Sequence, residues 1–591
     1  MGTPTGMLPR RRCAVHSLLR RRRDEGRTRR RSRIASLAAA LATLLLGLSV
    51  PQGVPAQETR AERWRADLAY FTTQLELRHP DLYHTIPRER FHGAVRAIRD
   101  RIPALSEHGI AVELARLLAR VGDGHTLVPL MWDRSLGFGR LPVELVRTSG
   151  GVSVLAADSS FGELVGARVL RIGSLDVDAV LDSVATIVSR DNAWTPYTDA
   201  AEYAGVPEIL HTLGITTTFD RVPLVVEDRS GDRRQLELAA VDREAPIRWD
   251  YGEYGGSRPW LSRRDDAYWL TVLPDDTTAY VQFNRADRDK EEESVAEFGR
   301  RLLGLVREGS VRRIVLDLRW NRGGSRWRAR HLLGALVAVE HALGVSRSRR
   351  ARTPGGHLVT LIGPNTFSAA TQFALDLELH TNTAFVGLPT GGKPNHFGEV
   401  GRFRLPESGF EIRHSVYYHQ ATHARDTRPA IFPDRWVHWT PGDVAAGRDP
   451  VLEAALAWRA LPSAVEELRT RVREDGTGPA LAWLDSVAAE TSPDLAIEEG
   501  ELNRFGYELL SDGDAAAAAA VFRWNADRHP WSANVYDSLA DAYLALGRDR
   551  EAGELLCRAF AIDPQFDRAL DRGLDCGPIA RRTTGRTRPA G

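Results

Sequence analysis

The chain has 591 residues, of which 43% are hydrophobic and 27% are charged, a composition typical of soluble globular proteins. This length exceeds what one hydrophobic core supports and predicts three or four domains. Residues 1–33 hold twelve arginines and two acidic residues, so residues 34–591 carry a formal charge of −9 within a total of +1. That balance gives no reason to expect nucleic-acid binding.

An apolar stretch follows the basic leader. Ile34 to Val50 is apolar for 17 residues and precedes Val54-Pro55-Ala56, where small residues are typical of signal-peptidase cleavage before Gln57. We therefore predict that residues 1–56 are a basic leader and signal peptide, and that the protein is exported to the periplasm or the extracellular space. The alternative is an uncleaved membrane anchor, since 17 residues is near the lower limit for a span.

Residues 57–135 are predicted to form an N-terminal helical region. Segments 62–77, 88–102 and 110–121 have helical periodicity, and the last runs into Gly122-Asp123-Gly124-His125-Thr126. A histidine just after a Gly-Asp-Gly break is held on a tight loop, and its pKa suits acid–base chemistry near neutrality. A lone histidine is more often structural, so this motif alone does not decide its role.

Residues 136–255 are predicted to form a small β-rich module, because several short apolar runs are separated by turn residues. The segment from Gly166 to Gly173 (GARVLRIG) resembles the core of a PDZ-like module. Such modules bind extended chain ends by adding a strand. A plain β-subdomain without a peptide groove is the alternative.

Strands and helices alternate over residues 256–460, which predicts an α/β layered core with parallel strands. One predicted strand, 312–319, ends at Trp320-Asn321-Arg322-Gly323-Gly324-Ser325. Two glycines beyond a strand permit close backbone approach, so the N–H groups of Gly323 and Gly324 are candidates for an oxyanion hole together with that of Ala369. The alternative is a simple turn.

Ser368 lies between a predicted buried strand, 357–362, and a predicted helix that starts after it. A serine in this position is presented at a helix N-terminus, where orphan backbone N–H groups can receive negative charge. The sequence therefore indicates a candidate nucleophile. An ordinary helix N-cap is the alternative.

Lys393 lies in a glycine-rich turn and is one of only two lysines in the chain; the other, Lys290, belongs to a solvated charge run. A partly buried lysine can lose its proton and act as a base, whereas arginine cannot. Lys393 is therefore a candidate base for Ser368. Chance placement or a structural contact is the alternative.

Three segments, 314–324 (IVLDLRWNRGG), 366–374 (TFSAATQFA) and 386–395 (VGLPTGGKPN), together resemble the carboxyl-terminal processing (tail-specific) peptidase family, which includes the tricorn core protease. The resemblance extends over about residues 60–455. It implies a crotonase-like layered α/β catalytic core that carries a PDZ-like module, and a serine endopeptidase activity.

The resemblance also implies roles for single residues. Ser368 falls on the nucleophile, and the oxyanion-hole stretch comprises Gly323, Gly324 and Ala369. Lys393 falls on the base of the processing-protease branch, whereas His125 falls on the catalytic histidine of the tricorn-like branch. The orienting acid of that branch is matched best by Asp426 and second by Glu399.

This chain departs from both branches, because Pro394 and Asn395 replace the glutamine region that follows the lysine and because a lysine is nevertheless present. The nucleophile is therefore the firmer prediction. We favour His125 slightly over Lys393 as the base, since the lysine can instead shape its loop. No CxxC or HExxH occurs, and His414, His419 and His423 lack a carboxylate framework, so we predict no metal and no cofactor.

Residues 461–576 are alanine-rich and are predicted to form helical repeats. Gly513 and Gly547 lie 34 residues apart, as do Pro530 and Pro564, which is the tetratricopeptide period. Such a region can bind a protein partner or serve only for packing. Cys557 and Cys576 are either disulfide-bonded or a free buried pair. Residues 577–591 have no pattern and are predicted to be a disordered tail.

We therefore predict an exported serine endopeptidase that acts on peptide or protein substrates through an acyl-enzyme on Ser368. A catalytically silent ligand- or peptide-binding protein on the same fold is the rival hypothesis. A third hypothesis is an esterase, which shares the nucleophile and differs in the leaving group.

Overall fold

The fold is taken from a computed structural model of the chain. It describes residues 56–252, 259–286, 293–345, 356–424, 426–458, 463–489, 495, 497, 499–530, 532–562, 566–574 and 576. The predicted leader, apart from Ala56, and the predicted tail, 577–591, lie outside the described residues. Everything below concerns the unit Gln57–Gly591.

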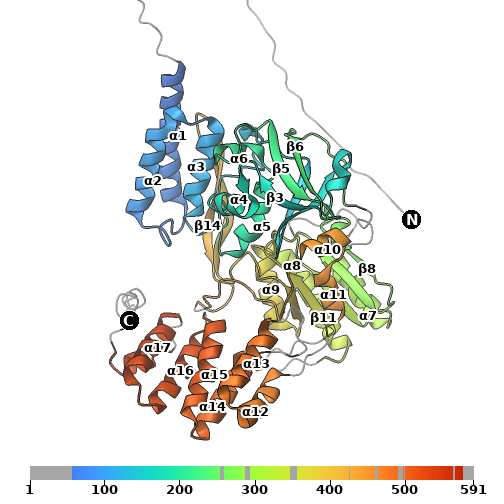
Figure 1. The fold of residues 1–591 in the computed structure, drawn as a ribbon, viewed down its shortest axis with the longest axis vertical. Coiled ribbons are helices and arrows are strands. Elements are labelled where there is room, and N and C mark those ends of the chain that lie inside the picture. Colours follow the sequence, from blue (N-terminus) through green and yellow to red (C-terminus); the bar gives the residue numbers. More distant parts are fainter. Residues whose placement is uncertain are drawn as a thin grey trace, which may run out of the picture. The chain divides into compact units, whose positions relative to one another are not determined.

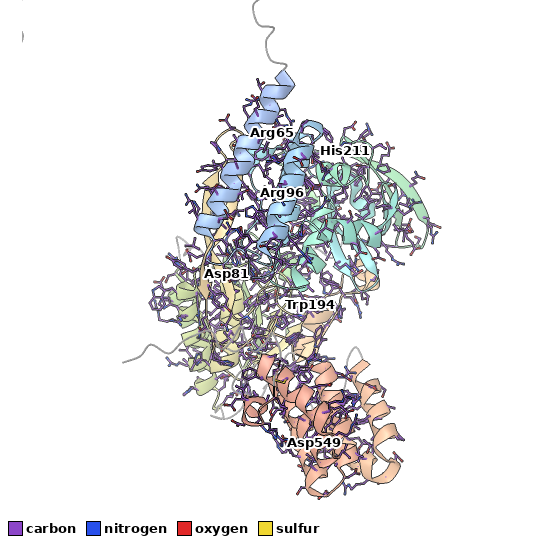
Figure 2. The ribbon with its side chains drawn as sticks, turned by 90° about the vertical axis from the view of Figure 1, so that its left-hand side faces the viewer. Arg65, Asp81, Arg96, Trp194, His211 and Asp549 are labelled. Carbon is purple, nitrogen blue, oxygen red and sulfur yellow. A yellow bond between two sulfur atoms is a disulfide. The ribbon has the colours of Figure 1, made fainter. Side chains whose placement is uncertain are left out.

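Three helices begin the described chain, in the region predicted to be helical: α1 (Ala56–Arg78), α2 (Arg88–Arg101) and α3 (Glu107–Ala119). Arginines such as Arg65 and Arg96 lie on the exposed faces of α1 and α2 (Figure 2). α3 is mostly buried, and Ser106 caps it by accepting a hydrogen bond from the N–H of Gly109. Among the described residues, no helix combines the length and apolarity that a membrane span requires.

A seven-stranded antiparallel sheet follows, with the order β1-β2-β3-β5-β6; β4 pairs with β3 and β7 with β2. Its strands are β1 (Val143–Thr148), β2 (Gly151–Asp158), β3 (Arg168–Ile172), β4 (Leu175–Asp176), β5 (Arg221–Glu227), β6 (Arg233–Ala239) and β7 (Trp249–Asp250). The helices α4 (Val177–Ala185), α5 (Trp194–Tyr203) and α6 (Pro207–Thr212) lie between β4 and β5 in the chain.

A second sheet of six strands, two of which are labelled β8 and β11 in Figure 1, has the order β15-β12-β11-β10-β9-β8, and only the pair β8–β9 is antiparallel. Its strands are β8 (Tyr268–Val272), β9 (Thr278–Phe283), β10 (Arg313–Asp317), β11 (Leu358–Ile362), β12 (Ala384–Gly387) and β15 (Arg435–Trp436). This agrees with the predicted α/β core of parallel strands.

Helices cover both faces of this sheet, because its residues alternate between two separate apolar clusters. One cluster includes Ile314 with side chains of α7 (Val295–Arg307), α8 (Arg326–Ala342) and α9 (Ala369–His380). The other includes Val315 with side chains of α11 (Pro450–Leu456), which follows the short helix α10 (Pro441–Ala446). Parallel strands buried on both faces require this layered arrangement.

An antiparallel hairpin, β13 (His396–Arg404) and β14 (Glu411–His419), leaves the second sheet and contacts the N-terminal helical region. Its turn packs Phe410 edge-on against Trp64, with 5.0 Å between ring centroids. Its strand β14 forms a bridge from Arg413 to Leu127, close in the chain to His125. The hairpin therefore ties the histidine loop to the α/β region.

The C-terminal helices have a hydrophobic core of their own, and neighbours in the chain pack on one another. They are α12 (Ala464–Asp475), α13 (Thr477–Ala489), α14 (Glu499–Ser511), α15 (Ala515–Arg528), α16 (Ala533–Ala545), α17 (Asp549–Ile562) and α18 (Arg568–Asp571). Cys557 and Cys576 form a disulfide, which resolves the two alternatives left by the sequence.

Candidate active site

Ser368 lies in a strained turn between β11 and α9. Its φ of 56° is in the region that non-glycine residues rarely adopt. Thr366 holds the turn: its hydroxyl accepts the N–H of Gly363 and donates to the carbonyl of Leu318. The side chain of Ser368 makes no capping bond to α9. The N-cap alternative therefore does not describe this serine.

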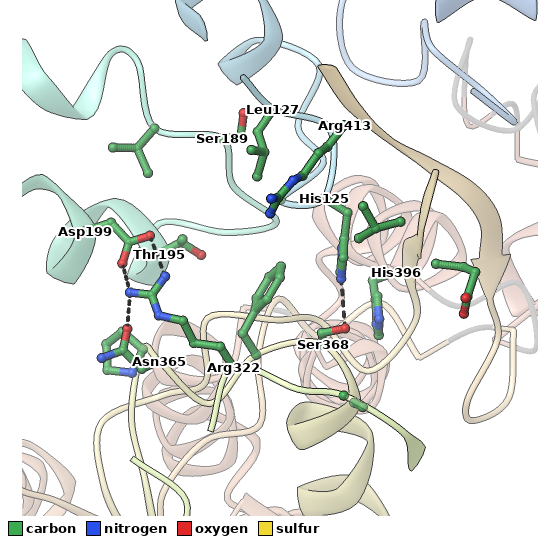
Figure 3. A pocket seen from close by; sticks show the side chains of 18 of the residues that line it. His125, Leu127, Ser189, Thr195, Asp199, Arg322, Asn365, Ser368, His396 and Arg413 are labelled. Atoms are coloured by element: carbon green, nitrogen blue, oxygen red, sulfur yellow. Dashed lines mark hydrogen bonds and ion pairs between the residues drawn. The ribbon is translucent and has the colours of Figure 1, made fainter. Parts of the chain in front are cut away.

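The hydroxyl of Ser368 instead meets an imidazole. His125 Nε2 lies 2.8 Å from Ser368 Oγ, although 243 residues separate the two in the chain (Figure 3). The histidine is 5% exposed, and its ring stacks on that of Phe367 at a centroid distance of 4.7 Å. The ring of His396 stacks next to it at 5.6 Å. These contacts leave the imidazole little freedom to turn away from the serine.

Two buried carboxylates lie beside His125. Asp123 Oδ1 accepts the backbone N–H of His125 and lies 3.7 Å from its Nδ1, which is too long for a hydrogen bond. Asp191, from the segment between α4 and α5, accepts the N–H of Gly124 at 2.8 Å. One ionisable atom of each of these three side chains lies within 4.8 Å of the others.

The carboxylates change the pKa of the imidazole. Burial lowers the pKa of His125, but the side-chain interaction with Asp123 and the negative charges of Asp191 and Asp123 outweigh it, and the net shift is upward. Burial raises the pKa of Asp123, but the side-chain interactions with His125 and His79 lower it by more, so the net shift is strongly downward. Burial raises the pKa of Asp191. His125 is therefore a stronger base than an ordinary histidine.

Three backbone N–H groups lie near the serine: Gly323 is next to it, and Gly324 and Ala369 line its cavity. Gly323 has a φ of 116°, and a Cβ there would lie 2.9 Å from that of Ser368 and 3.2 Å from the nitrogen of Ala369. The N–H of Gly323 itself donates to Asn321 Oδ1. Within the described part of the chain, the N–H groups of Gly324 and Ala369 have no recorded acceptor. These two are therefore the donors available to a substrate oxygen.

The other predicted catalytic residues, Asp426, Glu399 and Lys393, form no hydrogen bond with the side chain of His125 or Ser368. Asp426 makes an ion pair with Arg428 at 2.9 Å. Glu399 is exposed on β13, in the left-handed region at φ 58°, and lines the same pocket as Ser368. The half-buried Lys393 holds His396 Nδ1 with its carbonyl oxygen at 2.8 Å. No hydrogen bond of its amine to a described residue is recorded.

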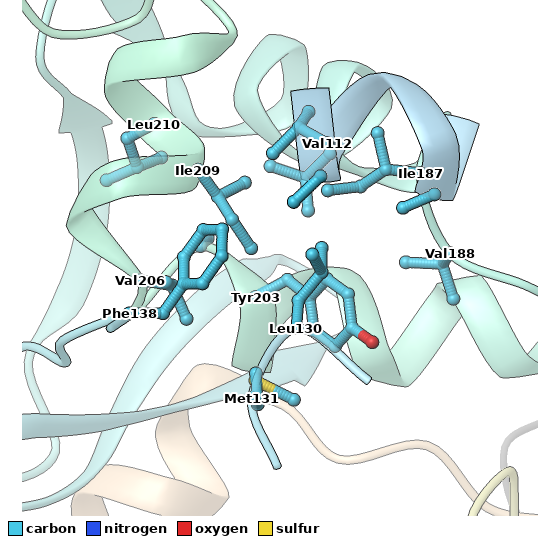
Figure 4. Close-up of a cluster of buried hydrophobic side chains, with 14 of the residues drawn as sticks. Val112, Leu130, Met131, Phe138, Ile187, Val188, Tyr203, Val206, Ile209 and Leu210 are labelled. Atoms are coloured by element: carbon cyan, nitrogen blue, oxygen red, sulfur yellow. The ribbon is translucent and has the colours of Figure 1, made fainter. Parts of the chain in front are cut away.

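A cavity of about 700 Å³ opens onto Ser368. Its apolar wall includes Val128, Ile187 and Val188, which belong to a buried cluster with α3, α5 and α6 (Figure 4). At another side, Arg322 is held by Asp199 at 2.7 Å and by Asn365 at 2.7 Å (Figure 3). The site is thus a pocket with one apolar wall, and charged or polar side chains such as Arg322 and Glu399 line the rest of it.

Asp123, Asp191 and His396 were not among the site residues predicted from the sequence. Asp123 stands two residues before His125 in the Gly-Asp-Gly-His motif, so a local signal existed. Asp191 and His396 had none, because only tertiary contacts bring them to His125. The cluster of Asp123, His125 and Asp191 is close enough to hold a cation. The predicted absence of a metal stays a prediction.

Known proteins were compared with the chain. Residues 277–434 match the sequence model of Peptidase family S41. The solved structure of mature CPAF complexed with lactacystin is similar at a TM-score of 0.47 and 12% identity, over 67% of this chain and 98% of that one. The structure of the photosystem II D1 C-terminal processing protease is similar at a TM-score of 0.31 and 16% identity, over 65% of this chain and 94% of that one. A comparison with curated protein sequences found no match.

An imidazole on a serine hydroxyl, next to backbone amides at a helix N-terminus, is the arrangement of a serine hydrolase. The match of residues 277–434 to Peptidase family S41 agrees with the predicted resemblance to carboxyl-terminal processing peptidases and with a serine-type peptidase.

Proposed function

We propose that this protein is an exported serine endopeptidase in which Ser368 is the nucleophile and His125 the general base. The 2.8 Å contact between Ser368 Oγ and His125 Nε2 carries the proposal. A strained, uncapped serine supports it, because strain of this kind persists where the surrounding structure imposes it and clusters at active sites.

In this mechanism, Ser368 Oγ attacks the substrate carbonyl carbon while its proton passes to His125 Nε2. The N–H groups of Gly324 and Ala369 hold the oxyanion. Gly323 supplies no donor, but its lack of a side chain lets the backbone lie close to Ser368. His125 then returns the proton to the leaving amine, and water releases the acyl-enzyme by the same route. Asp123 and Asp191 stabilise the imidazolium that forms.

We infer that the substrate is a peptide or protein with an apolar side chain that enters the cavity and contacts Val128, Ile187 and Val188. Residues 136–255 serve as a PDZ-like module, supported by β3 lying within the segment Gly166–Gly173. Residues 461–576 serve as tetratricopeptide-like repeats for a protein partner, supported by the 34-residue step and the consecutive helices α14–α17. The domain boundaries are those predicted from the sequence.

A fluorophosphonate probe tests the nucleophile. We expect labelling of the wild type and of Ser325→Ala, and no labelling of Ser368→Ala. Ser325 is a matched control, because it lines the same cavity but its hydroxyl caps α8 by accepting the N–H of Arg328. Labelling that survives in Ser368→Ala would contradict the proposal.

The same proteins separate the rival functions. Hydrolysis of a quenched peptide library that depends on Ser368 supports an endopeptidase. Labelling with turnover of small esters alone supports an esterase, and no labelling of the wild type supports a silent binding protein.

A further inference from the structure

The carboxylate of Asp123 already accepts hydrogen bonds from the histidine loop and from His79. Its carboxylate accepts the backbone N–H of His125, the hydroxyl of Thr126 at 2.5 Å and His79 Nε2 at 3.0 Å. His79 Nδ1 accepts the N–H of Asp81, so its Nε2 carries the proton that it donates to Asp123. Two of these bonds hold Asp123 to the histidine loop and the third holds it to His79 after α1, while its Oδ1 lies 3.7 Å from His125 Nδ1, beyond hydrogen-bond distance.

The imidazole and Asp191 each keep one unsatisfied buried atom. Among the described residues, His125 Nδ1 and Asp191 Oδ2 are both buried without a hydrogen-bond partner. The first is a donor when Nε2 faces the serine, and the second is an acceptor. An unpaired buried polar group costs free energy, so two complementary unpaired atoms on side chains of one cluster call for an explanation.

The segment that carries Asp191 is fastened to both sides of the site. Ser189 donates to the carbonyl of Thr126 at 2.8 Å, on the histidine loop. Asn192 donates to the carbonyls of Thr390 and Pro429 at 3.0 and 2.6 Å, on the α/β region. These bonds hold the carboxylate of Asp191 between the two regions that supply the histidine and the serine.

We propose that Asp191 is a positioning residue that accepts a hydrogen bond from the Nδ1–H of His125 during the reaction, while Asp123 serves to hold the loop. The proposal rests on the proposed function of Ser368 and His125. The serine proton moves to Nε2, the Nδ1 proton stays on the ring and is donated to Asp191 Oδ2, and the carboxylate remains ionised. The pairing keeps the ring in the tautomer that presents a basic Nε2 to Ser368.

The test is Asp191→Asn in the full chain, assayed on a cleaved peptide. We expect kcat to fall by about 100-fold or more with KM within about twofold, because an amide does not stabilise the imidazolium or its tautomer. The midpoint of kcat/KM against pH should move to lower pH, since His125 loses a stabilising negative charge. Asp191→Glu should restore part of kcat.

Asp443→Asn is the matched control, because this buried carboxylate bonds Thr440 and Arg448 and lies outside the cavity lining. It should leave kcat and the pH midpoint unchanged. Wild-type kcat in Asp191→Asn would overturn the inference. Activity that is independent of Ser368 and His125 would instead overturn the proposed function.

A spectroscopic readout covers the case in which Asp191→Asn folds poorly. In NMR spectra of ¹⁵N-histidine-labelled protein at low pH, an Nδ1 proton that is hydrogen-bonded to a carboxylate gives a strongly downfield proton resonance. We expect this resonance from His125 in the wild type and in Asp123→Asn. Its absence from the wild type, or its loss in Asp123→Asn, would overturn the inference.

Discussion

At the residue scale, the structure distinguishes the two candidate bases. His125 contacts Ser368 Oγ through Nε2, whereas the amine of Lys393 has no hydrogen bond to a described residue and acts electrostatically on Asp191. We expect His125→Ala to lower kcat/KM by at least about 10³-fold, since the serine then lacks a proton acceptor. Lys393→Met should retain activity within about threefold. The reverse order in steady-state kinetics would assign the lysine as the base.

The pH dependence of activity follows from the raised pKa of His125. The base acts only when it is deprotonated, so kcat/KM should rise with pH through a midpoint above the ordinary histidine value of about 6.5. A profile of kcat/KM from pH 5 to 9 measures this midpoint. A midpoint below about 6 would contradict the upward shift.

Asp123 links the same loop to stability. Its pKa in the folded protein lies below the value in an unfolded chain, so its charge contributes stability above the unfolded pKa, and that contribution is lost as pH falls through the folded pKa. We expect Asp123→Asn to lower the melting temperature at pH 7 by several degrees. The difference from wild type should shrink below about pH 3 in scanning calorimetry.

Gly323 is required for close approach at the serine. Gly323→Ala would place a Cβ 2.9 Å from that of Ser368 and strain a φ of 116°. We expect kcat to fall by about 100-fold or more, with a stability loss of about 1–3 kcal/mol. Gly409→Ala is the matched control, because it adds a Cβ at φ 76° with nothing within 4 Å. It should affect stability alone, as measured by urea unfolding and peptide hydrolysis.

At the element scale, the segment between α4 and α5 joins the histidine loop to the α/β region. Asn192→Ala would leave the carbonyls of Thr390 and Pro429 without this donor. We expect a destabilisation of about 1–3 kcal/mol together with a lower kcat. Asn534→Ala, which removes a single 3.4 Å bond to Glu499, is the control and should leave kcat unchanged. Equal kcat in both variants would show that the segment does not hold the site.

Elements were predicted well where periodicity is strong. The buried strand and helix on either side of Ser368 occur as β11 and α9, because an apolar β-branched run and a helical run meet at a Gly-Pro-Asn turn. The hairpin β13–β14 was not predicted. It lies between two regions, and its pairing with the histidine loop depends on contacts distant in sequence.

At the scale of the whole molecule, a disulfide closes the C-terminal helical region. Cys557 and Cys576 are 19 residues apart, and a loop of this length corresponds to about 3 kcal/mol of stabilisation. We expect the double variant Cys557→Ser, Cys576→Ser to unfold its C-terminal helices at lower urea concentration. Peptide hydrolysis should be unchanged. A wild-type urea profile for the double variant would show that the bond contributes little.

The sequence by itself predicted the candidate nucleophile, the α/β core and the histidine loop, because each depends on local patterns: a strand–turn–helix junction, alternating elements and a Gly-Asp-Gly-His motif. Only the tertiary structure decided which base meets Ser368 and which carboxylates meet His125. These partners come from segments up to 243 residues apart. Their proximity depends on how the sheets and loops pack, and no local residue pattern encodes that packing.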